Sequence, residues 1–252
     1  MIIGIIGCGA ISNIIVKHIQ KEENIEIKYF FDKNYNEAKK LAEKTKGTAC
    51  REYTEMLDKV DLVLEAASQE FIKTEATNIL KHTNLLNMSI GALMDKTLLE
   101  QMKKTAKENN TRIYAPSGAI LGIDGLKAAC TKDTETIKLT TRKSPKSLGI
   151  ETKEEKTIFK GKASQAVKKY PKNMNIAATL SLAAKKDIDV ELKVDPKVKE
   201  NIHELNVKGK FGQFQVKTEN LPSEENPKTS ELAALSAIEK IKSLNENLNI
   251  GN

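Results

Sequence analysis

The sequence predicts an α/β protein with a parallel-sheet domain followed by a smaller domain that combines strands and helices. Three observations lead to this fold class. Short apolar runs alternate with helical patterns over the first 116 residues, which is typical of a parallel sheet with crossover helices. The pattern changes after Pro116, and strand-like segments then predominate up to residue 218. In the last segment the apolar residues recur at helical spacing, which predicts a terminal helix that packs on a larger part of the protein.

The first 116 residues supply the alternating elements. The apolar runs are only four to seven residues long and are bounded by turn or capping residues, which argues against a buried all-helical domain. Strands are predicted at 2–6, 25–31, 61–67, 84–90 and 112–115, with a weak strand at 48–50, and helices at 10–21, 35–45, 70–82 and 95–109.

The rest of the chain reads as a second domain. After a glycine-punctuated loop and helix (SGAILGIDGLKAA), strands are predicted at 136–143, 156–163, 189–194, 201–209 and 210–218, and a helix at 174–186. The last two strands form a predicted hairpin around Gly209, and the capping signal in NPKTSEL starts the final helix. We therefore expect one domain at 1–116 with the C-terminal helix (about 226–252), and another at 117–225.

Composition excludes several classes of protein. The 252 residues are 39% apolar and 30% charged, which is ordinary for a folded soluble chain. The formal charge of +7 comes from 41 basic residues interleaved with 34 acidic ones, and only three residues are arginines, so the cations are not gathered as in nucleic-acid-binding proteins. No apolar run is long enough to cross a bilayer and no signal peptide is evident. We expect a cytoplasmic protein that binds neither nucleic acid nor membranes.

The cysteines predict neither a disulfide framework nor a metal site. Cys8, Cys50 and Cys130 are odd in number and widely spaced, without a metal-ligand pair. We expect reduced, mostly buried thiols.

A glycine-rich turn near the amino terminus indicates dinucleotide binding. GCGAIS (7–12) joins a predicted strand to a predicted helix. Gly7 permits the tight turn and Gly9 lets backbone approach a pyrophosphate, while the helix start at Ala10 and Ile11 offers amide groups to the phosphates. Ser12 stands where a third glycine is usual.

Asp32 strengthens this interpretation, because it ends the second strand about 20 residues downstream, where a carboxylate binds the adenosine ribose hydroxyls. It also favours NAD over NADP, although Lys33 partly offsets the repulsion of a 2′-phosphate. The strand ends EAASQE and MSIGAL, including Ala66 and Ser68, line the same predicted crevice. A glycine turn with a coincidental aspartate, or a methyltransferase with a similar sheet, remains open at this point.

Three positions in the second predicted domain are candidate functional residues. His203 lies in a predicted strand, and the ordinary pKa of imidazole suits proton transfer near neutrality, although a lone histidine taken by itself favours a structural role. Asn175 opens a predicted helix and either caps it or bonds a coenzyme amide. Ala119 follows the last strand of the first domain, in a connecting loop or at the nicotinamide.

The order and spacing of eight segments resemble the L-aspartate dehydrogenase family over nearly the whole chain. The segments are GCGAIS, EAASQE, MSIGAL, YAPSGAI, TTRKSP, YPKNMNIAATLSLAA, DPKVKENIHELNVKGKFG and NPKTSELAALSAI. The resemblance implies a Rossmann-type NAD(P)-binding domain, a smaller catalytic and dimerisation domain, and a homodimer. It places the family's catalytic histidine on His203 and its coenzyme contacts on Ala119 and Asn175. Ser12 and Leu121 depart from the family pattern.

The implied reaction is the oxidation of L-aspartate to iminoaspartate with NAD or NADP, feeding NAD biosynthesis. A dicarboxylate substrate needs cations, and the candidates are Arg142, Lys143, Lys146 and Lys172. The alternatives are another two-domain reductase of the homoserine or dihydrodipicolinate type, and a non-catalytic dinucleotide sensor. A titratable His203 argues against the sensor.

Overall fold

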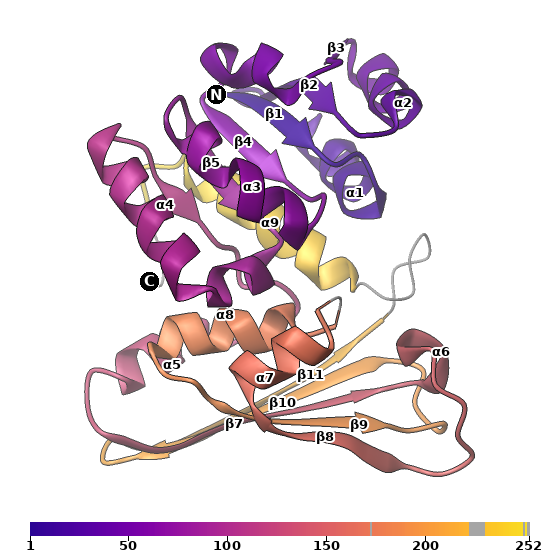
Figure 1. The fold of residues 1–252 in the computed structure, drawn as a ribbon, viewed down its shortest axis with the longest axis vertical. Helices are drawn as coiled ribbons and strands as arrows, with labels where there is room; N and C mark the ends of the chain where they lie inside the picture. Colours follow the sequence, from indigo (N-terminus) through magenta and orange to yellow (C-terminus); the bar gives the residue numbers. More distant parts are fainter. Residues whose placement is uncertain (172, 222–229, 249, 251–252) are drawn as a thin grey trace. The chain divides into compact units, whose positions relative to one another are not determined.

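The structure is a computed structural model that describes residues 1–171, 173–221, 230–248 and 250. The chain divides into two compact units, drawn as a ribbon in Figure 1. Unit 1 comprises Met1–Pro116 and Ala234–Leu248, and the main part of unit 2 is Ser117–Ala233. Among the described residues, no helix combines the length and apolar character needed to span a membrane.

Unit 1 is a six-stranded parallel sheet in the order β3-β2-β1-β4-β5-β6. Its apolar strands are buried, and their helices begin at polar caps such as Asn34, Ser68 and Asp95. The strands are β1 (Ile2–Ile6), β2 (Glu26–Phe31), β3 (Thr48–Ala49), β4 (Leu62–Glu65), β5 (Asn84–Asn87) and β6 (Ile113–Tyr114). The helices are α1 (Ala10–Ile19), α2 (Tyr35–Thr45), α3 (Gln69–Leu80), α4 (Lys96–Glu108) and the 3₁₀ helices η1 (Tyr53–Lys59) and η2 (Ile90–Met94).

The terminal helix α9 (Glu231–Ser243) returns to unit 1. Lys242 forms an ion pair with Glu22, and Lys240 lies over the ring of Tyr114 at 5.3 Å. Residues 226–229, where the sequence predicts the start of this helix, and the predicted domain boundary at 225 lie outside the described residues.

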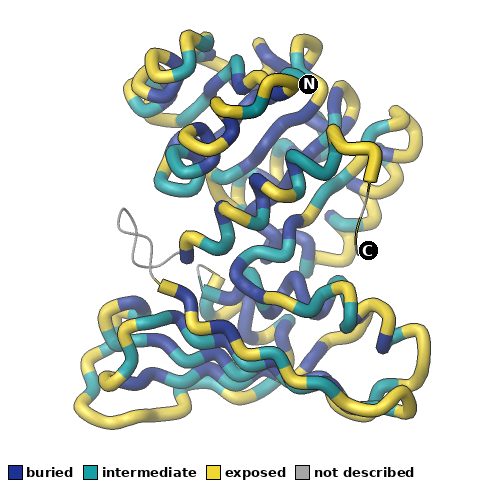
Figure 2. Tube along the Cα trace, turned by 180° about the vertical axis from the view of Figure 1, so that it is seen from behind, coloured by how far each residue is buried: buried dark blue, intermediate teal, exposed yellow. Residues whose placement is uncertain are grey.

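Unit 2 is a five-stranded sheet in the order β11-β10-β7-β9-β8, in which only the β7–β9 pair is parallel. Helices α5, α7 and α8 lie on one side of this sheet (Figure 1), and burial alternates along its strands (Figure 2). The strands are β7 (Thr134–Lys143), β8 (Lys156–Lys162), β9 (Asp189–Val194), β10 (Asn201–Gly209) and β11 (Gly212–Asn220). The helices are α5 (Ile123–Ala129), α6 (Pro145–Leu148), α7 (Ala163–Lys169) and α8 (Asn175–Ala184).

The fold agrees with the predicted α/β class and adds several short elements. The hairpin turn falls between the paired residues Gly209 and Gly212, and Gly212 has φ +121°. The helices η1, η2, α6 and α7 are new; each has at most seven residues, too few for a clear helical period. Cys8 and Cys50 are buried, Cys130 is half-buried, and all three are free thiols.

Candidate functional site

The turn between β1 and α1 needs glycine for two different reasons. Gly7 has φ +90°, and a Cβ there would lie 2.6 Å from the amide nitrogen of Ala67, so both the conformation and the space exclude a side chain. Gly9 is the N-cap residue of α1, and a Cβ there would meet no atom within 4 Å. The backbone at Gly9 is therefore open to a ligand, as a pyrophosphate at a helix N-terminus requires.

Side chains fix the shape of this turn. The Oδ2 atom of Asp32 accepts a hydrogen bond from the Cys8 amide at 2.8 Å, and Oδ1 accepts one from the Asn34 amide at 2.8 Å. The hydroxyl of Ser12 donates to the Gly7 carbonyl at 2.5 Å, so serine at the third fingerprint position braces the turn. A carboxylate has about four acceptor sites, and Asp32 therefore keeps the capacity to accept hydrogen bonds from ribose hydroxyls.

Ala10 and Ile11 are the first two residues of α1 and are half-buried. The first amides of a helix have no intrahelical partner and attract anions. The neighbouring thiol adds no negative charge, because burial, assisted by the nearby Asp32 carboxylate, raises the pKa of Cys8 to about 12. The open backbone at Gly9, the unpaired amides at the start of α1 and the uncharged Cys8 thiol together fit a bound diphosphate.

A buried carboxyl group that sequence reasoning missed joins the next two strand ends. Oε1 of Glu65, the last residue of β4, accepts hydrogen bonds from the amides of Ala67 (2.8 Å) and Ser68 (2.9 Å) and from the hydroxyl of Ser89 (2.8 Å). Oε2 accepts from the Ser89 amide at 3.1 Å. Burial raises the pKa of Glu65. The available signal was an acidic residue inside the apolar run DLVLEAA.

The predicted coenzyme residues Ala66 and Ser68 lie on the loop that Glu65 holds. Ala66 is half-buried, and Ser68 caps α3 by accepting a hydrogen bond from the Phe71 amide at 3.2 Å. A Cβ on Gly91 in η2 would overlap the side-chain amide of Gln69 at the start of α3. The start of α3 and the helix η2 are thus packed directly against each other.

One face of the unit 2 sheet changes from apolar to polar along its strands. The apolar positions are Ile137 and Leu139 on β7, Leu205 and Val207 on β10, and Phe214 and Val216 on β11. The polar positions that continue the same alternation are Thr141 and Lys143, Asn201 and His203, and Thr218 and Asn220; all six are buried. Since buried polar groups are costly in an apolar layer, this polar end of the sheet is the candidate catalytic site.

His203 occupies the centre of this polar cluster. It pairs with Thr141 on β7 and with Thr218 on β11, and its Nδ1 lies 3.0 Å from the Thr141 hydroxyl. Burial, with the positive charge of Lys143 as a second cause, lowers the pKa of His203 to about 3. The expectation of an imidazole that titrates near neutrality therefore differs from the free protein, in which the buried imidazole lies near a cation and its pKa is lowered.

The structure separates the four candidate cations. Lys143 is buried, its Nζ donates to Oδ1 of Asn173 at 3.2 Å, and burial lowers its pKa to about 8. No described carboxylate lies within 4.0 Å of this ammonium group. Lys146 is exposed, and Lys172 lies outside the described residues.

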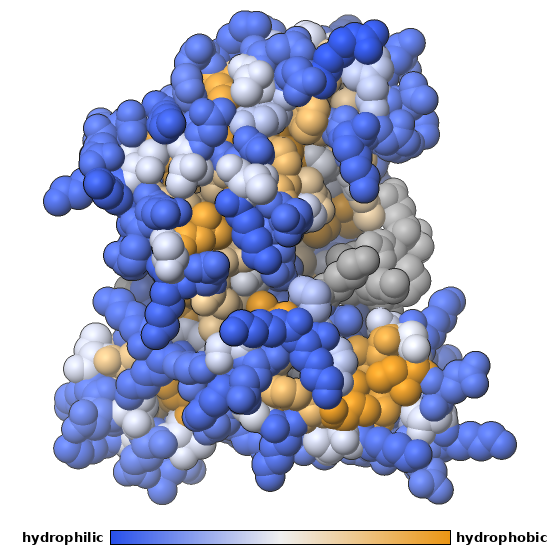
Figure 3. All heavy atoms as spheres, in the orientation of Figure 1, coloured by the Kyte–Doolittle hydropathy of each residue, from blue (hydrophilic) through white to orange (hydrophobic). Residues whose placement is uncertain are grey.

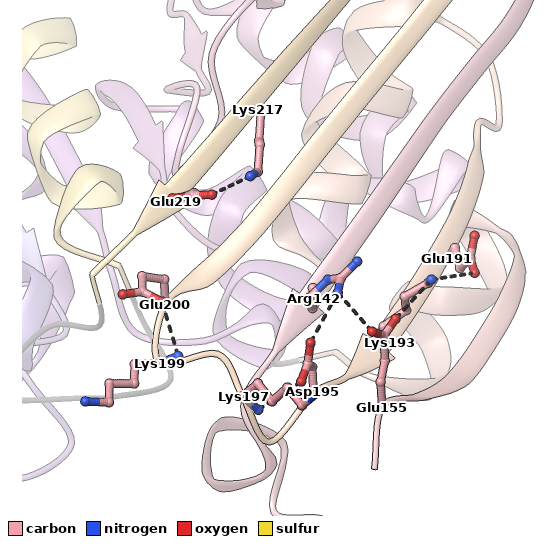
Figure 4. Close-up of polar contacts among 10 residues, drawn as sticks. All are labelled: Arg142, Glu155, Glu191, Lys193, Asp195, Lys197, Lys199, Glu200, Lys217 and Glu219. Carbon is pink, nitrogen blue, oxygen red and sulfur yellow. Dashed lines mark hydrogen bonds and ion pairs between the residues drawn. The ribbon is translucent and has the colours of Figure 1, made fainter.

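Arg142 points to the opposite face of the sheet. Its guanidinium forms ion pairs with Glu155 at 3.0 Å and Asp195 at 3.2 Å, in a row of charged residues that includes Lys193 and Glu191 (Figure 4). The second oxygen of Asp195 accepts from the Lys197 amide at 2.8 Å. Arg142 therefore has its own counterions, and of the described candidates only Lys143 shares a face with His203.

The two predicted coenzyme contacts in unit 2, Ala119 and Asn175, differ in their structural surroundings. The Ala119 carbonyl accepts hydrogen bonds from Nδ2 of Asn220 at 2.8 Å and from the Thr218 hydroxyl at 3.3 Å. Asn175 is the first residue of α8, but Met174 occupies the N-cap position, so Asn175 does not hold the capping place that one interpretation gave it. Sequence reasoning missed Thr218 and Asn220, because polar residues at the end of an amphipathic strand are usually exposed to solvent.

A cavity lies beside α6, away from these residues. Its volume is about 730 Å³, and its lining includes Pro145, Lys146, Gly149 and Ile150. Hydrophilic side chains cover most of the face seen in Figure 3, and a hydrophobic area lies over unit 2 near α6. Neither His203 nor Lys143 lines this cavity, so it is separate from the candidate catalytic site.

Comparisons with known proteins cover both units. Residues 7–116 match the family described as homoserine dehydrogenase, NAD binding domain, and residues 124–244 match the family described as aspartate dehydrogenase, C-terminal. L-aspartate dehydrogenase of Methanothermobacter thermautotrophicus is 47% identical over 100% of this chain and 98% of its own length. That of Methanosarcina mazei is 42% identical over 99% and 98%. The crystal structure of aspartate dehydrogenase from Thermotoga maritima has a TM-score of 0.83 at 28% identity, covering 100% of this chain and 99% of that one.

Proposed function

This chain belongs to the L-aspartate dehydrogenase family, and from that premise we propose that it oxidises L-aspartate to iminoaspartate with NAD or NADP. The reaction moves a hydride from the substrate α-carbon to the nicotinamide and releases one proton. Water then adds to the imine, which collapses to oxaloacetate and ammonia. The observation that carries the proposal is the buried polar cluster around His203 and Lys143 within a family match that spans the whole chain.

Lys143 supplies the recognition of an anionic substrate. A buried ammonium group without a carboxylate partner is unfavourable, and a substrate carboxylate at Lys143 supplies the missing counterion. The cluster thus favours a small acid. An aspartate side-chain or α-carboxylate fits this role, and substrates that leave Lys143 unpaired are rejected.

His203 serves as the proton acceptor and donor. In the unprotonated form its imidazole accepts the proton that the substrate ammonium group must lose before a hydride can leave the α-carbon. The Thr141 hydroxyl engages Nδ1, which leaves Nε2 for the substrate or for the water that attacks the imine. The same nitrogen returns the proton when the carbinolamine collapses.

The turn at Gly7 and Gly9 and the carboxylate of Asp32 hold the coenzyme, whose nicotinamide accepts the hydride when bound. Ala10 and Ile11 lie beside the diphosphate, and Ala66 and Ser68 lie along the crevice at the strand ends. Ala119 and Asn175 contact the nicotinamide part. The assignments in unit 1 are supported by the open backbone at Gly9 and the loop held by Glu65, and those of Ala119 and Asn175 are what the family resemblance implies.

We also propose that the enzyme is a cytoplasmic homodimer that feeds NAD biosynthesis, as the family resemblance implies. Size-exclusion chromatography with light scattering measures the oligomeric state directly. A monomeric mass across the working concentration range would contradict the dimer.

One assay tests the function. Purified protein is mixed with oxaloacetate, ammonium and NADH or NADPH, and coenzyme oxidation is followed by absorbance, with pyruvate, 2-oxoglutarate and aspartate semialdehyde as controls. We expect oxaloacetate to be aminated far faster than the controls. Equal rates with pyruvate or 2-oxoglutarate, or turnover of aspartate semialdehyde alone, would favour another two-domain reductase. Coenzyme binding without any turnover would favour a dinucleotide sensor.

A further inference from the structure

Lys143 lies on the same buried face as His203, and its ammonium group has no carboxylate counterion among the described residues. Both residues lie on the buried face of the unit 2 sheet, on the neighbouring strands β7 and β10. Thr141, which pairs with His203 and lies two residues before Lys143, links the two positions along the face. Because the region is buried, a positive charge there acts strongly on a second group that would also become a cation.

We propose that binding of the substrate carboxylate to Lys143 converts His203 into an effective base. In the free protein the Lys143 ammonium opposes protonation of the imidazole. When a carboxylate pairs with Lys143, the net charge beside His203 falls from one to zero, and the imidazole can accept the proton of the substrate ammonium group. Proton transfer is thereby confined to complexes in which the anion is already in place. This inference rests on the proposed function in taking the anion to be the substrate.

Among the described residues, the charged groups around His203 leave Lys143 as the one that acts on the imidazole. On the same face of β7 and β11, its neighbours are uncharged except for Lys143. Of the helices on that side, α8 carries no ionisable side chain, and the charged residues of α5 and α7 are exposed. Those exposed residues are Asp124, Lys127, Lys168 and Lys169. The buried Asp195, beyond the end of β9, is engaged by Arg142 and the Lys197 amide.

The pKa shifts agree in direction with this arrangement. Burial lowers the pKa of Lys143 to about 8, and burial together with Lys143 lowers that of His203 to about 3. At neutral pH the free site therefore holds a charged lysine and a neutral, weakly basic histidine. Removing the lysine charge, by an anion or by substitution, is expected to raise the pKa of His203.

An unpaired acceptor beside Lys143 also points to a ligand. Asn201 lies across from Lys143, one residue beyond the Ile202–Arg142 pair, on the face that carries His203. Its Oδ1 atom is buried and has no hydrogen-bond partner among the described residues. Buried acceptors are seldom left unpaired. An amino acid can satisfy both groups, with its carboxylate at Lys143 and its ammonium group at Asn201, next to the base.

The chain contains only three histidines, so an NMR titration of the imidazole signals tests the coupling directly. Wild type, Lys143→Met and the control Lys146→Met, which alters an exposed lysine three residues away, are titrated without coenzyme, with and without succinate. For wild type and the control we expect succinate to raise the His203 pKa by about one unit or more. For Lys143→Met we expect a raised pKa without succinate and no further response to it. An unchanged His203 pKa in Lys143→Met, or a full succinate response in that variant, would overturn the proposal.

Two further measurements keep the test decisive. If Lys143→Met does not fold, Lys143→Gln replaces it, and wild type is titrated with succinate and with acetamide as an uncharged control; a His203 pKa unchanged by succinate overturns the proposal. The titration involves no turnover, so its result is separate from the oxaloacetate assay. A succinate response without aspartate dehydrogenase activity would sink the proposed function and leave the coupling standing.

Discussion

The carboxyl group of Glu65 accepts hydrogen bonds from both the amide and the hydroxyl of Ser89, and thereby joins the end of β4 to the loop after β5. The same carboxyl group accepts hydrogen bonds from two further amides, those of Ala67 and Ser68 in the loop after β4. A Cβ on Gly7 would collide with Ala66 and Ala67. The glycine turn therefore packs on a loop whose shape depends on one buried acid.

We expect Glu65→Gln to weaken NADH binding by roughly tenfold or more, because in either orientation the amide nitrogen faces at least one backbone N–H group, which can only donate, and each lost hydrogen bond of this kind costs about 1–3 kcal/mol. Nicotinamide fluorescence gives the dissociation constant. The exposed Glu70→Gln, in the first turn of α3, is the matched control. A Glu65→Gln protein with the wild-type dissociation constant and Tm would show that the carboxyl group does not shape the crevice.

Asp32 offers a test of coenzyme choice. Asp32→Asn keeps an acceptor for the Cys8 amide but removes the negative charge that repels a 2′-phosphate. We expect wild type to bind NADH more tightly than NADPH, and the variant to lose most of that preference, chiefly through tighter NADPH binding. Dissociation constants for both coenzymes check this. A wild-type preference for NADPH would remove Asp32 from its assigned role.

Asn220 should act on the coenzyme through Ala119. Asn220→Ala removes the shorter of the two side-chain hydrogen bonds to the Ala119 carbonyl, and Thr218→Val removes the other. We expect each variant to raise the coenzyme KM several-fold with a smaller change in kcat, and the double variant to be less than additive, since both act on one carbonyl. Asn206→Ala, on the opposite face of β10, is the control. Unchanged KM values in the double variant would contradict a positioning role.

The sequence predicted elements more securely than it predicted which side chains meet. The turn at Gly7 and the carboxylate of Asp32 follow a local spacing rule, so both could be placed from a few residues. Lys143 and Arg142 are neighbours in the same predicted strand, and only the pairing of His203 with Thr141 places Lys143 on the face that carries His203. That register depends on contacts between strands about 60 residues apart, which periodicity does not reveal.

The protonation state of His203 was also beyond the sequence. A histidine in a strand pattern gives no measure of burial, and the charge that acts on it comes from another strand. Glu65 was missed for the same reason, because its partners lie on two loops separated by more than 20 residues.

Lys143 should make stability depend on pH. Its pKa is lowered from 10.5 in a solvated chain to about 8 in the folded state, so the folded state binds fewer protons between these values and stability rises as pH increases from about 8 to 10. Below pH about 8 the buried lysine stays charged, and this lowers the free energy of unfolding by the full amount, on the order of 3 kcal/mol. Lys143→Met should therefore raise Tm at neutral pH, with an advantage that shrinks towards pH about 10.

Calorimetry at both pH values measures this effect, with Lys146→Met as the control. Succinate should raise the Tm of wild type but not of Lys143→Met. An advantage of Lys143→Met that is equal at both pH values would mean that the lysine charge is not its source.

Substitution of His203 is the most direct test of the candidate catalytic site. We expect His203→Ala to lower kcat by roughly 10² to 10⁴, the usual range for a positioned acid or base, while NADH affinity changes little. The lowered pKa of His203 in the free protein also leads to a prediction about how kcat and kcat/KM depend on pH. Because kcat/KM reports the free enzyme and kcat the enzyme–substrate complex, protonation of His203 should limit kcat at a higher pH than it limits kcat/KM.

His203→Asn keeps a polar side chain near Thr141 but cannot titrate, so it should lose the acid limb of kcat as well as most of the rate. His82→Ala, at an exposed histidine that contacts Asp58, is the matched control and should behave as wild type. Because the imidazole is buried, each variant must first be shown to fold by its Tm and its NADH dissociation constant. A folded His203→Ala protein with near-native turnover would return this histidine to a purely structural role and move the base to another group on the polar end of the sheet.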